Sequence, residues 1–335
     1  MSLTNRKIVL DNYPSALPTA DAMRLETVEA REPEDGEILV AVDAVSIDAW
    51  IGTTMSPGWL HQMIPLEATV PALGVGRVLA SGSSEFAEGD AVFGALCAQT
   101  HATVAASDCH KIDVSQVPLS AYLGLLSPTT GFTSFFGIRD VGQVKAGDTV
   151  LVSAAAGAVG TTAGQMARLE GATTVIGIAG GPEKCRFLTE VAGFDAAIDY
   201  KGEDIDARLK EIAPEGIDVF FDNVGGEMLD VVLEHIRERA RVVICGAISQ
   251  YADNQNVYGP THYLRLAERY ARMEGFTAFH FEDRYHEAAA AIAQWIAEGK
   301  ITQHEQVETG LESFPGALEM LFTGGNTGKL LVQIS

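Results

Sequence analysis

Residues 150–160 read Val150-Leu151-Val152-Ser153-Ala154-Ala155-Ala156-Gly157-Ala158-Val159-Gly160, and this stretch decides the fold. An apolar run is followed by a turn of small residues and a helical segment, the context that a dinucleotide-binding fingerprint requires. Gly157 stands where the backbone has to approach a pyrophosphate, and Gly160 where the helix has to pack closely on the strand. N–H groups at the helix start, with the helix dipole, would bind the phosphates. A plain tight strand–helix turn remains the alternative interpretation.

The segments around this turn predict the fold class. From about Leu126 onward, strands and helices alternate, which is typical of a parallel sheet with crossover helices. Helices are predicted over residues 162–170, 183–191, 204–212, 228–238 and 283–298, and the residues before Leu126 are rich in short strands and turns. We therefore predict an α/β protein: a doubly wound Rossmann sheet in residues 126–299, and a β-rich domain of residues 1–125 to which residues 300–335 return.

Composition excludes several classes of protein. The 335 residues are 47% hydrophobic and 20% charged, enough for a sizeable core and about two domains. Lys and Arg total 23 against 45 Asp and Glu, so the net charge of −22 disfavours nucleic acid and anionic membrane surfaces as partners. The four cysteines form no CxxC pair, and no apolar stretch approaches the length of a membrane span or a signal peptide. The sequence predicts a cytoplasmic protein.

The end of the second predicted strand indicates which dinucleotide binds. NAD-binding folds place Asp or Glu there to bind the ribose 2′-hydroxyl, whereas this strand ends in Ala179, Gly180 and Gly181. Lys184 follows shortly after, and a cation beside an uncharged strand end suits a 2′-phosphate. We predict NADPH, although Lys184 also fits as a solvated helix cation.

Residues 72–82 have the glycine frame of the medium-chain dehydrogenase/reductase superfamily. Zinc alcohol dehydrogenases carry a His-Glu pair where this chain has Ala72-Leu73, and the scattered histidines do not replace these ligands, so no metal is predicted. The chain resembles the zinc-free NADPH-dependent double-bond reductases of this superfamily, which include prostaglandin, alkenal and curcumin reductases. The matching segments include residues 131–133, 154–160, 221–226, 245–251, 272–276 and 325–329.

The resemblance implies a GroES-like fold for the β-rich domain, a homodimer, and a set of cofactor-binding residues. These residues are Gly157, Ala158, Val159, Gly160, Lys184, Tyr200, Asn223, Cys245, Gly246, Ala247, Ile248, Ser249, Tyr251, Phe276, Thr277, Ala278 and Asn326. Lys184 and Tyr200 correspond to the 2′-phosphate contacts of the family. Packing would equally explain Cys245 and Phe276, and turn formation would explain Asn223 and Asn326.

The activity that the resemblance implies is hydride transfer from NADPH to the β-carbon of an α,β-unsaturated ketone or aldehyde. Negative charge then develops on the carbonyl oxygen, and donors placed there lower the barrier. Tyr251 matches a family tyrosine and is the predicted catalytic residue, either as a donor to the enolate or by ordering the ribose hydroxyl that donates. The alternative is that Tyr251 only lines the cofactor site.

The substrate side departs from the family. Where relatives have Asp-Pro-Tyr-Met-Arg, this chain has Asp48-Ala49-Trp50-Ile51-Gly52, and the family's glycine-rich turn appears as 127–131 with Thr129. Trp50, Thr129 and Tyr251 are the predicted substrate residues, and Trp59 and Met63 are expected to add apolar surface to the substrate site. The alternative is that the apolar residues pack in the core, as such residues more often do. Because the family's arginine is absent from this segment, which carries Ile51 and Gly52 instead, a neutral enone, enal or quinone acceptor is expected. The alternative functions are an NADPH:quinone oxidoreductase and a non-catalytic NADPH-binding sensor or structural protein.

Overall fold

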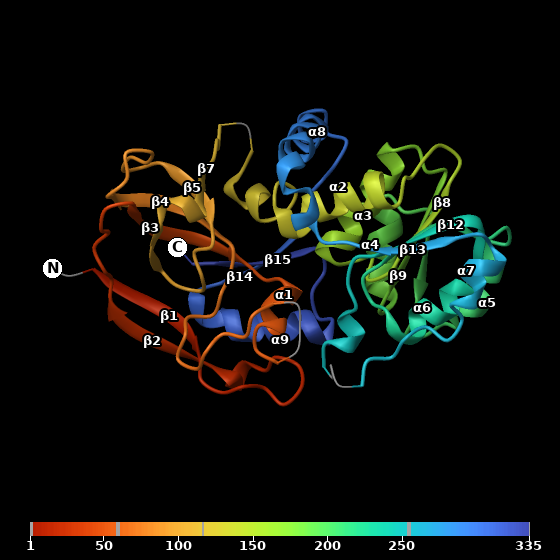
Figure 1. Ribbon diagram of the computed structural model, residues 1–335, viewed down its shortest axis with the longest axis horizontal. Coiled ribbons are helices and arrows are strands. Elements are labelled where there is room, and N and C mark those ends of the chain that lie inside the picture. Colours follow the sequence, from red (N-terminus) through yellow and green to blue (C-terminus); the bar gives the residue numbers. More distant parts are fainter. Residues whose placement is uncertain (1–2, 58–60, 116, 253–255, 335) are drawn as a thin grey trace. The chain divides into compact units, whose positions relative to one another are not determined.

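The computed structural model describes residues 3–57, 61–115, 117–252 and 256–334, and the chain divides into two compact units (Figure 1). The first unit comprises Met1–Gly124 and Glu305–Ser335, and the second comprises Leu125–His304. Residues 300–304 belong with the second unit because hydrogen bonds tie them to it: the Thr302 N–H donates to Gln165 (2.9 Å), and Gln303 accepts the Leu125 N–H (2.6 Å). The chain therefore returns to the first unit five residues later than residue 300.

A six-stranded parallel sheet forms the centre of the second unit. Its strands are β8 (Thr149–Val152), β9 (Thr174–Ala179), β10 (Ala196–Asp199), β11 (Ile217–Asp222), β12 (Ile236–Ile244) and β13 (Arg272–Gly275). They lie in the order β10-β9-β8-β11-β12-β13, so the strand order reverses between β8 and β11. This is the doubly wound Rossmann order, in which the reversal creates the ligand-binding switch point. The predicted fold class is confirmed.

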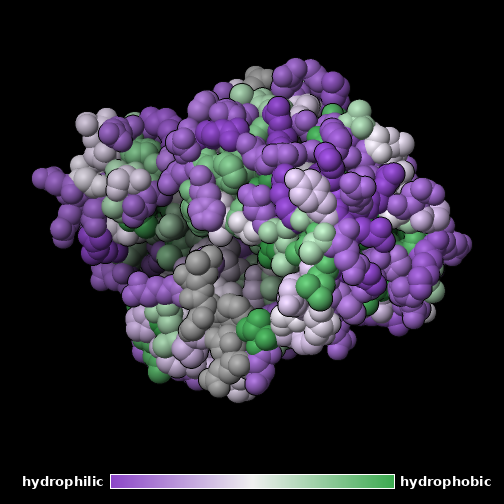
Figure 2. All heavy atoms as spheres, turned by 45° about the vertical axis from the view of Figure 1, so that its right-hand side comes forward, coloured by the Kyte–Doolittle hydropathy of each residue, from purple (hydrophilic) through white to green (hydrophobic). Residues whose placement is uncertain are grey.

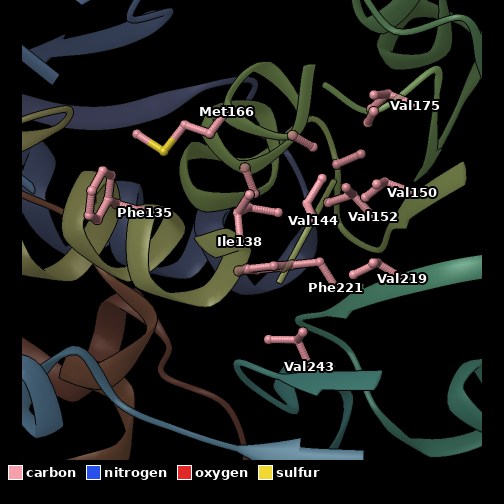
Figure 3. Close-up of a cluster of buried hydrophobic side chains, with 14 of the residues drawn as sticks. Phe135, Ile138, Val144, Val150, Val152, Met166, Val175, Val219, Phe221 and Val243 are labelled. Atoms are coloured by element: carbon pink, nitrogen blue, oxygen red, sulfur yellow. The ribbon is translucent and has the colours of Figure 1, made fainter. Parts of the chain in front are cut away.

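Helices cover both faces of this sheet. They are α2 (Thr133–Phe136), α3 (Ala158–Leu169), α4 (Pro182–Glu190), α5 (Ile205–Ile212), α6 (Gly226–Leu233), α7 (Leu264–Glu268) and α8 (Tyr285–Ala297), with π-helical turns η4 (Pro128–Phe132) and η5 (Gly137–Val141) and 3-10 turns η6 (Ile248–Gln250) and η7 (Ala278–Arg284). Because side chains alternate along a strand, Val150 and Val152 face α2, α3 and α8, whereas Leu151 faces α5 and α6. Figure 3 shows the first of these two cores, in which Val150 and Val152 lie near Ile138 and Val144.

The strands of the first unit pair antiparallel, except that β14 (Glu305–Thr309) and β15 (Lys329–Gln333) pair in parallel. A seven-stranded sheet contains β3 (Glu37–Ser46), β4 (Gly74–Ser81), β5 (Ala91–Gly94), β6 (His101–Ala105), β7 (Cys109–Lys111), β14 and β15. A separate two-stranded sheet pairs β1 (Thr4–Leu10) with β2 (Met23–Glu29). The helices of the unit are α1 (Ala49–Thr53) and α9 (Phe314–Thr323), with the 3-10 turns η1 (Ala20–Ala22), η2 (Ala106–Asp108), η3 (Leu119–Leu123) and η8 (Leu311–Ser313). The C-terminal strand β15 pairs with β3, which explains why the end of the chain belongs to this unit. Lys329, buried at the start of β15, donates to Asp48 (2.7 Å) and Ser46 (2.6 Å).

One predicted helix is too long. Residues 228–238 were expected to be helical throughout, but α6 ends at Leu233 and β12 begins at Ile236. Ile236 pairs with Ile217 of β11, while the following charged residues at 237–239 are partly or fully exposed. Their charge pattern suits a solvated helix, and the pairing of β12 in the sheet overrides it. Among the helices of the described residues, none combines the length and apolar composition needed to cross a bilayer.

Candidate functional site: the carboxyl edge of the parallel sheet

The turn after β8 leaves the start of α3 open. Gly157 is the N-cap of α3 and makes no side-chain capping bond, so the first N–H groups of the helix are presented to a ligand. A Cβ at Gly160 would lie 2.4 Å from the Ala154 carbonyl oxygen, so only glycine lets the helix approach the strand this closely. Ala154 itself has a φ of 46°, in the left-handed region, which costs an alanine about 1–2 kcal/mol. Such strain is often found at binding sites.

A hydrogen-bond network joins the ends of β8 and β11 at the switch point. The buried Ser153 hydroxyl donates to Asp222 (2.7 Å) and accepts the Asn223 N–H (2.8 Å). The Asn223 side-chain amide donates to the Ser153 carbonyl (2.8 Å). Asp222 also accepts the N–H groups of Val224 (2.9 Å) and Gly225 (3.1 Å). Burial raises the pKa of Asp222, and these hydrogen bonds oppose the rise.

The loop after β12 is attached to the same network. The Cys245 N–H (2.8 Å) and the Gly246 N–H (3.1 Å) both donate to the Asp222 carbonyl. Further along, the Ile248 N–H donates to the Asn223 carbonyl (3.1 Å), and the Ser249 hydroxyl to the Val224 carbonyl (2.6 Å). Residues 245–249, predicted to run along the nicotinamide ribose, therefore lie beside the end of β11.

Tyr251 folds back over this loop. Its hydroxyl oxygen accepts the Ala247 N–H at 3.4 Å and lies 3.3 Å from where a Cβ of Gly246 would be. Burial raises the pKa of the Tyr251 phenol above its ordinary value, so the group keeps its proton at neutral pH and remains a donor. Burial likewise raises the pKa of the Cys245 thiol to about 12, which makes this cysteine a poor nucleophile.

The ends of β9 and β10 carry the predicted 2′-phosphate contacts. Lys184 is half-buried in the first turn of α4, and Tyr200 is exposed directly after β10. The Tyr200 hydroxyl lies 3.0 Å from where a Cβ of Gly180 would be, so its ring covers the end of β9. Lys201, which the sequence analysis missed, lies at the same place.

The remaining predicted residues of the second unit lie on two further segments. Phe276 follows β13, is buried, and its N–H bonds to the carbonyl of Ile244 in β12 (3.3 Å). Thr277 caps η7, in which Ala278 is buried. Thr129 lies in the π-helical turn η4, with its hydroxyl 3.1 Å from that of Ser127. π-helical turns are often found at functional sites.

Three of the residues discussed in the sequence analysis belong to the first unit: Trp50, Ile51 and Asn326. Asn326 is buried and donates to the Gly328 carbonyl (3.2 Å), which shapes the loop before β15. Trp50 is half-buried in contact with the ring of His61, and Ile51 is fully buried in the core. Trp59, an expected wall residue, lies outside the described residues, and Met63 is exposed.

The structure brings most of the predicted cofactor residues to one edge of one sheet. The turn 157–160, Asn223 and the loop 245–249 meet at the switch point through Ser153 and Asp222, two residues to which the sequence analysis gave no role. Ser153 offers little sequence signal, whereas Asp222 is recognisable as the last residue of a buried strand. Within the described ranges, no three His, Cys, Asp or Glu side chains are grouped as a metal site would require.

A parallel sheet in this strand order, with a glycine turn at its switch point, defines a Rossmann-type nucleotide-binding protein. Two family profiles match the chain: "Zinc-binding dehydrogenase" over residues 158–294 and "N-terminal domain of oxidoreductase" over residues 6–112. A putative NADP-dependent oxidoreductase of Bacillus subtilis is 38% identical over 100% of this chain and 99% of its own length. The NADP(+)-dependent 2-alkenal reductase of Nicotiana tabacum is 36% identical, with 99% and 98% covered.

A solved structure agrees with these relatives. CurA of Vibrio vulnificus in complex with NADPH is 36% identical, with a TM-score of 0.92 over 98% of this chain and 99% of that chain. The chain belongs to the medium-chain dehydrogenase/reductase superfamily, and its resemblance to the double-bond reductases in that superfamily is confirmed.

Proposed function

We propose that this protein is an NADPH-dependent reductase that reduces the carbon–carbon double bond of α,β-unsaturated ketones and aldehydes. The observation that carries the proposal is its full-length similarity to an NADP(+)-dependent 2-alkenal reductase. The open start of α3 at the switch point is the second support, because a dinucleotide enzyme needs a pyrophosphate site at this position.

The residues at the sheet edge fit NADPH. Gly160 lets α3 pack closely against the backbone of Ala154, and the open N–H groups of α3 after Gly157 suit a pyrophosphate. Lys184 and Tyr200, at the ends of the neighbouring strands, suit a 2′-phosphate. We assign Asn223, residues 245–249 and residues 276–278 to the ribose and nicotinamide. NADPH, when bound, supplies the hydride.

Tyr251 is the proposed catalytic residue. Hydride addition at the β-carbon of the acceptor leaves negative charge on its carbonyl oxygen. A phenol that keeps its proton in a buried position can donate a hydrogen bond to that oxygen and stabilise the enolate. The position of the Tyr251 hydroxyl against Gly246 and Ala247 supports this role, because it fixes the ring beside the loop proposed for the nicotinamide ribose.

For the acceptor we propose a neutral molecule, with Trp50, Thr129 and Tyr251 as substrate residues. The segment that carries the family's arginine, residues 48–52, has none in this chain, and its buried, apolar Ile51 offers nothing to an anionic group. The net charge of −22 also disfavours the approach of anions.

The test is an assay of NADPH oxidation with a panel of enones, enals and quinones. We expect rapid oxidation with neutral enones or enals. Faster turnover of quinones than of every enone and enal would replace the proposal with a quinone oxidoreductase. Tight NADPH binding with no oxidation by any acceptor would favour a non-catalytic NADPH-binding protein.

We also propose that the chain forms a homodimer in the cytoplasm, on the strength of the family resemblance and the sequence. In support of self-association, β13 is an edge strand whose four residues are all exposed, and Tyr263, Leu264 and Tyr270 nearby are exposed apolar side chains. On the face drawn in Figure 2, apolar residues form patches among hydrophilic ones. Sedimentation equilibrium tests the assembly: a monomer at micromolar concentration would overturn it.

A further inference from the structure

Tyr200 and Lys201 lie against the end of β9, and Lys184, 16 residues earlier than Tyr200 in the sequence, lies in the helix that follows β9. A Cβ at Gly180 would lie 2.9 Å from the Tyr200 ring and 3.0 Å from the Lys201 Cε. Both side chains therefore lie across the backbone of Gly180, and the absence of a side chain there is what lets them do so. Lys184 lies four residues after Gly180, in the first turn of α4.

A carboxylate at the end of β10 organises the backbone of this cluster. Asp199, the last residue of β10, accepts the Gly181 N–H (2.6 Å) and the Lys201 N–H (3.0 Å) on the same oxygen. The turn after β9 and the turn after β10 are thus held together by one side chain. This fixes the backbone of Lys201 beside that of Gly181, the N-cap of α4, and Lys184 lies in the first turn of that helix.

The electrostatics of the cluster favour an anion. Burial, followed by the charge of Lys201, lowers the pKa of Lys184, as expected for cations close enough to repel each other. This pair of cations lies in a chain with 45 acidic residues against 23 basic ones, so it marks a local site for an anion on an acidic protein. A phosphate monoester carries close to two negative charges and three acceptor oxygens, so it suits two lysines and a phenol.

We propose that Lys201 is a specificity-determining residue, the second cation of the 2′-phosphate site, and that Gly180 has to lack a side chain for this site to form. This inference rests on the proposed function, because it concerns how the same cofactor site distinguishes NADPH from NADH. Lys184 alone would give a site with one fixed cation. With both lysines, the preference of the site for NADPH over NADH depends on two charges. Asp199 maintains the geometry of the site through its backbone hydrogen bonds.

The experiment measures dissociation constants for NADPH and NADH, and for the probes 2′,5′-ADP and 5′-AMP, by calorimetry. Lys201→Ala is expected to raise the Kd for NADPH and 2′,5′-ADP about fivefold to tenfold, as for one charge-assisted hydrogen bond at an accessible site, and to leave NADH and 5′-AMP unchanged. Lys201→Arg should retain most of the affinity. The control is Lys210→Ala, an exposed lysine paired with Asp206 (2.6 Å) in α5, which should bind all four ligands normally.

The outcomes separate the inference from the proposed function. If Lys184→Ala weakens NADPH selectively while Lys201→Ala has no effect, the role of Lys201 is overturned and the function stands. An equal loss of NADPH and NADH affinity in Lys201→Ala would also overturn it, since the residue would then act on the fold. If the wild-type protein binds neither dinucleotide, the proposed function itself fails. Gly180→Ala should reproduce the selective loss, and unchanged NADPH affinity would remove Gly180 from the inference.

Discussion

Gly160 is the residue on which the pyrophosphate cradle depends most. The Ala154 carbonyl lies within 2.4 Å of the position that its Cβ would take, and this neighbour is backbone, so it moves only if the turn moves. The same contact explains why the turn from β8 into α3 is tight enough to bring the helix start to the sheet edge.

Gly160→Ala is therefore expected to push α3 away from the turn. We expect the free energy of unfolding to fall by about 1–3 kcal/mol, the usual cost of overpacking, and the Kd for NADPH to rise more than about tenfold. Denaturant unfolding and fluorescence titration measure the two effects. Gly316→Ala in α9 is the matched control, because its Cβ would meet no atom within 4 Å. Normal NADPH binding by Gly160→Ala would contradict the cradle.

Tyr251→Phe tests the proposed donor to the enolate. Because the phenol keeps its proton, its removal should lower kcat about tenfold to a hundredfold while the Kd for NADPH changes little. Stopped-flow single-turnover kinetics isolates the hydride step. Tyr270→Phe, which alters a tyrosine that is 75% exposed, serves as the control. An unchanged kcat would leave Tyr251 as part of the wall of the cofactor site.

At the scale of elements, the segment around residues 256–262 is attached to α6 through one carboxylate. The buried Asp230 accepts bonds from the Tyr258 hydroxyl (2.7 Å), the Thr261 hydroxyl (2.9 Å) and the His262 N–H (2.9 Å). Gln250 of η6 accepts the Tyr258 N–H (2.8 Å), so the segment is also tied to the turn before Tyr251. These contacts connect the position of α6 to that of the proposed site.

Asp230→Ala should release this segment. Three donors lose their acceptor, and we expect a loss of about 1–3 kcal/mol in the free energy of unfolding at neutral pH. Burial alone would raise the pKa of Asp230, but the hydrogen bonds lower it from 3.8 to about 2. Because the pKa is lower in the folded state, ionised Asp230 stabilises the fold fully at pH values above its unfolded-state pKa. This stabilisation is lost as the pH falls toward the folded-state pKa.

The difference in Tm between wild type and Asp230→Ala should therefore shrink as the pH falls from 3.8 toward 2, which differential scanning fluorimetry can follow. Glu227→Ala, at an exposed residue of the same helix, is the control. A difference independent of pH would mean that Asp230 contributes only packing.

Elements whose residues interact locally could be predicted from the sequence. Elements and contacts that depend on pairing between strands distant in the sequence could not. The strand–turn–helix of residues 150–160 is recognisable because glycine spacing and apolar periodicity are local signals. The short strands β13 and β14 were not predicted, since all four residues of β13 are exposed and β14 depends on pairing with β15. Lys201 was missed for the same reason, because only the parallel alignment of β9 and β10 brings it to Gly180 and Lys184.

At the scale of the whole molecule, the surplus of 22 negative charges should act on the choice of acceptor. We expect kcat/KM to be at least about tenfold higher for a neutral enone than for an analogue that carries a carboxylate. Added salt should raise kcat/KM for the anionic analogue and leave the neutral one nearly unchanged, because salt screens long-range repulsion. Steady-state kinetics at several ionic strengths checks both. A preference for the carboxylate-bearing enone would contradict the neutral acceptor.

The relatives and the carboxyl edge of the sheet support one central claim, that the chain delivers hydride from NADPH to the β-carbon of an enone or enal. The most direct measurement uses NADPH deuterated at C4 of the nicotinamide, with a neutral 2-alkenal as acceptor and mass spectrometry and NMR of the product. We predict a saturated aldehyde with deuterium at the β-carbon. Deuterium on the carbonyl carbon of an unsaturated alcohol, or no oxidation of bound NADPH, would contradict the claim.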